Sequence, residues 1–454
     1  MKRKLGTKSI FFTLIFLLFL PFLALPLSVL YADNEFITMS FTYENLTFTY
    51  TTKHLDYIDN FYLRSIAGKN GRLGAPSERA DLLEKVLTLG VEPKIALQYV
   101  FKGLEKTLEN MQQKIDCKPK NATMNFNPNI SPYFVFEKEK IGYKINVEKL
   151  CFEIIENLRT SANFTIKLKP QVLNPEIFYN DLKDFSNLRS SFFTSFNEDN
   201  VNRKHNIALA MKKFNGMKIE RGNEYSFNNT TGRRSDANGY LPANIIVDKK
   251  YVEGFGGGVC QASTTLYNAL LLAGMDFREV HSHSLVSSYV NMGFDAMVNY
   301  GTSDLRWVNN TNTDMFVRTY VEGNRVGVQI FGKPENPCYT YKRVTEVEKE
   351  IAPPADEVIV DVDGEYCDLV NFSDESAYIN LPHKGYKVRA ILEKYDGENL
   401  VERKFLRRVN YHATRGVKVV GVKERPASIV EEKTVPQVYL DKKTVDFWKN
   451  YNYY

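Results

Sequence analysis

The stretch Gly254–Ser284, GFGGGVCQASTTLYNALLLAGMDFREVHSHS, decides how the central part of this chain folds. Its apolar residues recur from Ala262 to Ala273 at i, i+4, i+7, i+8 and i+11. This spacing predicts a helix with one buried face. Gly274 follows where helices commonly end.

Cys260 stands at the predicted start of this helix, directly after Gly256, Gly257 and Gly258. Unpaired backbone N–H groups and the positive end of the helix dipole favour an anion there, so they lower the pKa of a thiol. The glycines leave room for a substrate backbone, and such loops can direct N–H groups at a developing oxyanion. The pattern indicates a nucleophilic cysteine.

A nucleophilic thiol needs a base and a group that orients the base. His281 and His283 follow the helix, and residues i and i+2 share one face of a strand, so either could reach Cys260. Asp295 and Asp304 are the nearby acids. The spacing does not choose between the histidines or between the acids.

Two other interpretations of Cys260 remain open on the residues alone. The cysteine could be a buried structural residue, or the HSHS segment could bind a metal together with Cys260 and an aspartate.

The N-terminus predicts export. Lys2, Arg3, Lys4 and Lys8 precede an uncharged, mostly apolar stretch over residues 9–32. This is a signal peptide or a membrane anchor, and its length favours the anchor, with the body outside the cytoplasm. The net charge of +5 suits an anionic cell wall, and no nucleic-acid partner is expected.

The chain has five cysteines, an odd number for an exported protein. If neighbours in sequence pair, Cys117–Cys151 and Cys338–Cys367 are the candidate disulfides. Cys260 would then be left as a free thiol.

Hydrophobic periodicity predicts an α+β protein of several domains. After residues 1–32 we expect an α+β domain over 33–175, a central α+β domain over 190–335, a small β domain over 350–425 and a tail over 426–454. Within them we expect a helix that Ser77 caps, and strands at Val286–Val290 and Met297–Tyr300.

Four segments of the central domain resemble one known family. They read YSFNNTTGRRSDANGYLPANII, GGGVCQASTTLYNALLLAGMDFREVHSHS, YVNMGFDAMVNYG and LRWVNNT. Together they look like the VanW domain of Gram-positive cell-envelope proteins, over roughly residues 190–335. The segment EKIGYKINVEKLCFEIIENL resembles the peptidoglycan-binding module that often precedes VanW domains.

The resemblance implies an L,D-transpeptidase that cross-links peptidoglycan stem peptides through a cysteine acyl-enzyme. In that interpretation Cys260 is the nucleophile and His283, which occupies the family's His-Ser position, is the base. The backbone N–H groups of Gly258 and Cys260 would hold the oxyanion. The remaining candidates for binding the oxyanion or the substrate are Gly257, Gln261, Arg234 and Arg306. One of the two arginines would pair with a carboxylate of the stem peptide.

The expected partners are therefore stem peptides, the cell wall and, through the N-terminal segment, the membrane. No cofactor and no metal are expected. A non-catalytic wall-binding scaffold and a cysteine amidase or peptidase are the alternatives.

Overall fold

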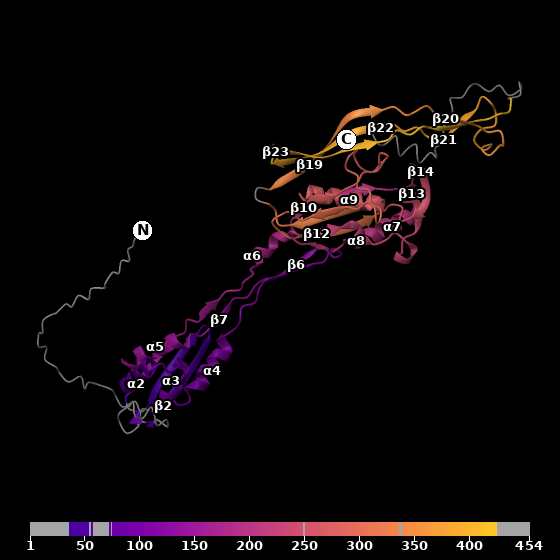
Figure 1. The fold of residues 1–454 in the computed structure, drawn as a ribbon. Helices are drawn as coiled ribbons and strands as arrows, with labels where there is room; N and C mark the ends of the chain where they lie inside the picture. Colours follow the sequence, from indigo (N-terminus) through magenta and orange to yellow (C-terminus); the bar gives the residue numbers. More distant parts are fainter. Residues whose placement is uncertain are drawn as a thin grey trace, which may run out of the picture. The chain divides into compact units, whose positions relative to one another are not determined.

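The computed structural model describes residues 36–53, 56–57, 72–73, 75–247, 250–335 and 338–424, and Figure 1 shows their fold. The described residues form helices and mixed sheets in more than one domain, which confirms the α+β class. They divide into two compact units. One comprises the residues up to Lys120 with Lys140–Pro175, and the other comprises Asn121–Glu139 with the residues from Glu176 onward.

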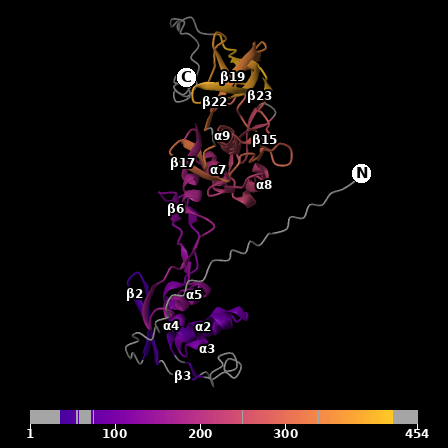
Figure 2. The same ribbon diagram turned by 90° about the vertical axis from the view of Figure 1, so that its left-hand side faces the viewer.

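The first unit packs helices against a three-stranded sheet (Figure 2). Ile37, Met39 and Phe41 alternate along the central strand and point into the core. The strands, in sheet order, are β2 (Leu46–Lys53), β1 (Phe36–Tyr43) and β8 (Asn163–Lys167). The helices are α2 (Pro76–Thr88), α3 (Pro93–Val100), α4 (Leu104–Ile115) and α5 (Val147–Leu158).

Ser77 does not cap the first of these helices. Helix α2 begins at Pro76, with Ala75 as N-cap and no side-chain capping bond. Proline suits the first helical position because it has no N–H to leave unpaired there. Ser77 consequently lies inside the first turn.

The second unit is built on an antiparallel sheet that carries two helices. The strands, in sheet order, are β10 (Leu188–Ser195), β18 (Arg325–Gly332), β17 (Met315–Glu322) and β11 (Lys218–Ile219). Helix α9 (Val259–Leu272) packs on β10 and β18, and α7 (Val201–Lys212) packs on β17 and on α9. A smaller sheet contains β12 (Glu224–Ser226), β16 (Arg306–Val308) and β15 (Asp276–Glu279).

Two hairpins complete this part of the second unit. They are β13 (Pro242–Val247) with β14 (Lys250–Phe255), and β5 (Thr123–Phe126) with β6 (Phe134–Glu137). The second hairpin lies within the 33–175 range expected for one domain, yet its aromatic side chains pack on Phe316 and Phe331 of the large sheet.

The C-terminal strands belong to the same unit. They are β19 (Tyr339–Ile351), β22 (Gly385–Asp396) and β23 (Asn399–Tyr411) in one sheet, and β20 (Glu357–Val360), β24 (Val417–Val420) and β21 (Ser376–Asn380) in another. Ala390 and Leu392 of β22 join the hydrophobic core around α9.

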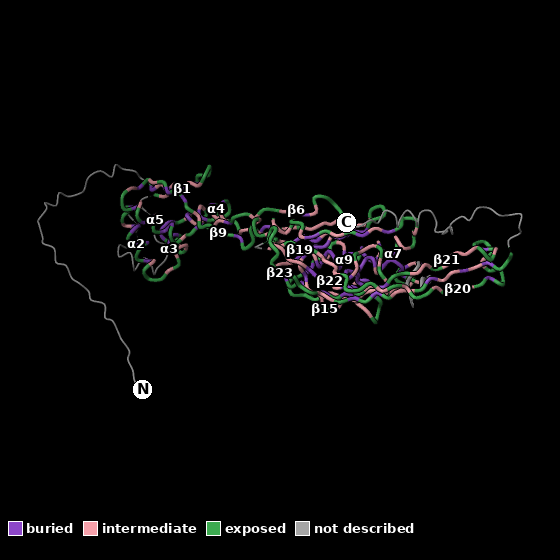
Figure 3. The backbone as a smooth tube through the Cα atoms, turned by 90° about the horizontal axis from the view of Figure 1, so that it is seen from above, coloured by how far each residue is buried: buried purple, intermediate pink, exposed green. Residues whose placement is uncertain are grey.

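Helix α9 begins at Val259 and is followed by Gly274 with a φ of +86°, as the sequence predicts. The prediction of one buried face was too narrow. The helix is buried on nearly every side because it lies between the β10 sheet and the C-terminal strands (Figures 1 and 3). Its polar side chains therefore need partners inside the protein.

Two further kinds of prediction, of strands and of disulfides, are wrong. The strands expected at 286–290 and 297–300 do not form, and this segment is irregular apart from isolated bridges. Both predicted disulfides are wrong, because all five cysteines are free. Cys151 is fully buried, its thiol donating to the Pro93 carbonyl, whereas Cys117 is exposed.

The predicted N-terminal export segment, residues 1–32, and the tail lie outside the described residues. Among the residues that are described, no helix is long and apolar enough to cross a membrane.

Candidate active site

The glycines before Cys260 allow close packing at the start of α9. Gly258 is the N-cap residue, with a φ of +103°. A Cβ there would lie 2.9 Å from side-chain carbons of both Arg203 and Ile207 on α7. A Cβ on Gly256 would lie 2.7 Å from Cγ of Arg234. Side chains of Arg203, Ile207 and Arg234 thus occupy part of the space that we expected the glycines to leave for a substrate.

Cys260 lies in the first turn of α9 and is partly exposed. Its thiol interacts with the side chain of His283, and its Sγ lies 3.4 Å from the Val298 carbonyl oxygen. Burial raises the pKa of Cys260, but the hydrogen bond and charge of His283, with a smaller contribution from Arg234, outweigh it and lower that pKa. The thiol is therefore set up to ionise readily.

His283 has the complementary shift. Burial lowers the pKa of His283, but interactions with Tyr289, Asp295 and Cys260 more than offset it, so the pKa lies well above its usual value. A lowered thiol pKa beside a raised imidazole pKa favours a thiolate–imidazolium pair near neutral pH. This pair is the reactive form of a cysteine nucleophile.

Asp295 orients the imidazole. Nδ1 of His283 lies 2.7 Å from Oδ2 of Asp295, and the backbone N–H of His283 donates to the same oxygen at 2.6 Å. Because Nδ1 is bonded to the carboxylate, Nε2 is left for the thiol. Asp295 is 1% exposed, and although burial raises its pKa, the hydrogen bond and charge of His283 lower it overall. Cys260, His283 and Asp295 thus form a connected chain.

The structure places the other histidine and the other acid elsewhere. Nε2 of His281 pairs with Glu279 at 2.8 Å. Asp304 accepts from the Ser226 hydroxyl and the Asn228 N–H, so it caps the short helix α8 (Phe227–Thr231). The two histidines have different partners because the backbone between them is not a strand. The rule that residues i and i+2 of a strand share one face therefore does not apply.

Polar residues of α9 hold the loop that carries Asp295. The Thr264 hydroxyl accepts from the Ala296 N–H at 2.9 Å, and Ser263 donates to the Ala296 carbonyl at 2.5 Å. The Asn268 amide donates to the Phe294 carbonyl at 2.9 Å. The STTLYN part of the motif therefore fixes the backbone on both sides of the carboxylate.

Gln261 is a structural residue in this geometry. It is 1% exposed, and its amide donates to the Thr194 hydroxyl and the Ser195 carbonyl while its oxygen accepts from Arg203. Both amide N–H groups are used inside the protein. In contrast, the backbone N–H groups of Gly258 and Cys260 have no acceptor within the described part of the chain. Gly257, whose carbonyl accepts from Asn206, lies between α7 and α9.

The two candidate arginines differ in environment. Arg306 pairs with Glu224 at 2.5 Å on the surface, where its side chain is 49% exposed. Arg234 donates through Nη1 to the Gly232 carbonyl, but its Nη2 is buried and has no hydrogen-bond partner among the described residues. Burial lowers the pKa of Arg234, and Cys260 is among its charged neighbours. Only Arg234 keeps an unused donor near the thiol.

Sequence reasoning missed two tyrosines. Tyr289 interacts with the charges of both His283 and Cys260, and burial raises the pKa of its phenol. Tyr411 of β23 donates to Oδ1 of Asp295 at 2.6 Å. Tyr411 lies outside the quoted motifs, and nothing in a single sequence pairs it with Asp295. Tyr289 opens the YVNMGFDAMVNYG segment, but its spacing from His283 does not show that the two side chains interact.

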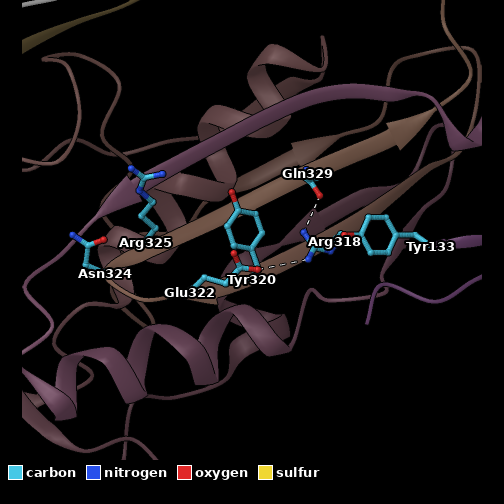
Figure 4. A pocket seen from close by; sticks show the side chains of 7 residues that line it. All are labelled: Tyr133, Arg318, Tyr320, Glu322, Asn324, Arg325 and Gln329. Atoms are coloured by element: carbon cyan, nitrogen blue, oxygen red, sulfur yellow. Dashed lines mark hydrogen bonds and ion pairs between the residues drawn. The ribbon is translucent and has the colours of Figure 1, made fainter. Parts of the chain in front are cut away.

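A separate hollow of about 600 Å³ lies on the other face of the large sheet. Figure 4 shows the side chains that line it, which are Tyr133, Arg318, Tyr320, Glu322, Asn324, Arg325 and Gln329. Arg318 stacks on Tyr133 and Tyr320, with ring centroids 4.6 and 5.1 Å from its Cζ. This lining has no cysteine or histidine. Within the described ranges, no cluster of three His, Cys, Asp or Glu side chains could hold a metal ion.

Two family models match parts of this chain. Residues 202–331 match a family model described as "VanW like protein", and residues 73–167 match one described as "Putative peptidoglycan binding domain". The uncharacterized protein YoaR of Bacillus subtilis (strain 168) is 28% identical over 232 residues, which are 51% of this chain and 75% of that protein.

A solved structure, HP0197-G5, matches 18% of this chain and 97% of its own, at 17% sequence identity. Its TM-score of 0.11 is too low to inform the fold. The two family matches support a function in the cell wall. Residues 202–331 are thus similar to the VanW family, and residues 73–167 ahead of them are similar to a peptidoglycan-binding domain.

Proposed function

We propose that this protein is an L,D-transpeptidase of the cell envelope that cross-links peptidoglycan stem peptides through a thioester at Cys260. The observation that carries the proposal is the connected chain Cys260–His283–Asp295 at the start of α9. The match to a peptidoglycan-binding domain supplies the substrate class.

The proposed chemistry follows from the ion pair. The Cys260 thiolate attacks the amide carbonyl carbon after the diamino acid of a tetrapeptide stem, while the N–H groups of Gly258 and Cys260 bind the oxyanion. The His283 imidazolium gives its proton to the departing D-Ala nitrogen, so a thioester forms as the C–N bond breaks.

The second half-reaction restores the site. An amine from a neighbouring stem attacks the thioester, neutral His283 takes the amine proton, and the thiolate leaves. One amide is exchanged for another, with no oxidant or other co-reactant. Arg234 is the proposed partner of the donor's terminal carboxylate, because its buried Nη2 has no other partner within the described residues.

Mass spectrometry of the acyl-enzyme tests the proposal. The protein without residues 1–32, incubated with a tetrapeptide stem, should gain the mass of the stem minus D-Ala at Cys260. A second stem should discharge the adduct and give a dimer joined between two diamino acids. Cys260→Ser should lose almost all transfer, whereas Cys117→Ser, which changes an exposed cysteine of the other unit, should not.

Two outcomes would replace the proposal. An adduct that only hydrolyses would favour a cysteine peptidase or amidase. A folded protein that forms no adduct with any stem would favour a wall-binding scaffold in which Cys260 is structural.

A further inference from the structure

The VanW-like match ends at residue 331, but the contacts around Asp295 do not end there. Asp295 has two carboxylate oxygens. Oδ2 accepts both bonds from His283, and Oδ1 accepts from the hydroxyl of Tyr411, at 2.6 Å and 116 residues further along the chain. One of the three hydrogen bonds to this carboxylate, the bond to the oxygen that faces away from His283, thus comes from the C-terminal sheet.

Tyr411 is built into this position. It is 1% exposed, and its oxygen also accepts the backbone N–H of Gly293 at 2.7 Å. Met292 packs against Tyr411, Val388 and Val409 in one small cluster. A buried hydroxyl that both donates and accepts in this way has little freedom to move.

Other residues of the same sheet hold the same loop. The guanidinium of Arg407 donates to the carbonyls of Gly293 and Asp295. Thr345 of β19 donates to the Met292 carbonyl at 2.7 Å. On Gly293, a Cβ would lie 3.0 Å from Cβ of Ala390, so the close approach of β22 requires a small residue there.

The loop is therefore held from both sides. Helix α9 binds the backbone of residues 294–296 through Thr264, Ser263 and Asn268, and the C-terminal sheet binds residues 292–295. A further backbone bond joins the His412 N–H to the Ser284 carbonyl, next to His283.

We propose that Tyr411 is a positioning residue for the Cys260–His283–Asp295 site, and that the β19–β22–β23 sheet is a structural part of the active site. Tyr411 acts through Asp295, which it keeps ionised and turned toward His283. The inference rests on the proposed function only for the identity of the reaction; the positioning role of Tyr411 does not depend on it.

Tyr411→Phe tests the proposal because it removes one hydroxyl and keeps the ring. Tyr386→Phe is the matched control, since Tyr386 is the cross-strand neighbour of Tyr411 and packs in the same cluster. The first readout is the pH dependence of iodoacetamide alkylation, measured at the Cys260 peptide. The second is transfer between stems, with kcat and KM determined separately.

We expect the acid limb of Cys260 alkylation to move to higher pH in Tyr411→Phe, because a less firmly held Asp295 stabilises the imidazolium less. The value of kcat should fall roughly 10- to 100-fold, as for a lost hydrogen bond to a buried charge, with little change in KM. Tyr386→Phe should match the wild type in both measurements.

A folded Tyr411→Phe protein with the wild-type alkylation profile and kcat would overturn the proposal. If this variant does not fold, Arg407→Lys serves instead, since it loosens the same loop, and a wild-type profile there would count equally against us. The two readouts also separate the hypotheses. A shifted thiol profile in a protein that never transfers refutes the proposed function alone, whereas transfer unaffected by Tyr411→Phe refutes the inference alone.

Discussion

Replacing Asp295 with asparagine removes the charge at the centre of the site and little else. Asp295 accepts three hydrogen bonds of 2.6–2.7 Å on two oxygens, whereas asparagine offers one oxygen and an NH2 group. The least costly orientation turns the amide oxygen to His283 and the NH2 group to the Tyr411 oxygen. The imidazole then keeps its bonds but loses the negative charge that stabilises its protonated form.

The magnitude follows from these three bonds. A hydrogen bond to a charged acceptor contributes about 1.5–3 kcal/mol, and one to a neutral acceptor contributes about 0.5–1.5 kcal/mol. Each of the three bonds therefore weakens by about 1 kcal/mol when asparagine replaces the carboxylate. Three such losses amount to about 3 kcal/mol, or roughly a 10²-fold lower rate of acylation. If the amide NH2 meets the imidazole instead, the wrong tautomer forms and the loss rises toward ~10⁴-fold, as in serine-protease triads.

The assay is the rate of acyl-enzyme formation, with alkylation of Cys260 as a measure of its ionisation. Asp304→Asn is the control, because Asp304 caps α8 and should affect stability rather than the thiol. If Asp304→Asn loses acylation while Asp295→Asn keeps it, the assignment of the orienting acid is refuted.

Three further predictions concern the other site residues. The lowered pKa of Cys260 and raised pKa of His283 predict that transfer falls at both pH extremes, whereas alkylation falls only as acid protonates the thiolate; a transfer rate that keeps rising above the pKa of His283 would contradict the ion pair. His283→Ala should slow acylation roughly 10²–10⁴-fold in single-turnover kinetics, and His281→Ala should not, because His281 pairs with Glu279. Arg234→Gln should raise KM for stems with a free terminal carboxylate but not for amidated stems; Arg306→Gln, which changes an exposed residue, is expected to match the wild type.

The start of α9 could be predicted from the sequence because its determinants are local. Helical periodicity, the glycines and the position of Gly274 all act within a few residues of each other. Cys260 consequently lies in the first turn, as expected. The polar residues of the motif were harder to interpret, because Thr264 and Asn268 bond to a loop that sequence spacing does not place beside them.

The choice between His281 and His283, and between Asp295 and Asp304, could not be made from spacing. Both choices depend on an irregular segment whose path is set by contacts with α9 and β23 rather than by its own residues. The disulfide prediction failed for a related reason. It used proximity in sequence, but Cys151 is turned into the core of its unit, where packing and the Pro93 carbonyl satisfy it.

The boundary of a sequence family and the boundary of an active site need not coincide. The matched residues 202–331 contain Cys260, His283 and Asp295, so they look sufficient for the chemistry. Yet a carboxylate that is 1% exposed must have its oxygens satisfied from within the protein, and the described donors of the matched region reach only one of them. The second oxygen requires Tyr411, and the loop requires Arg407. In the proposed site, this buried charge makes the folding of the C-terminal sheet a condition for the reactivity of the thiol.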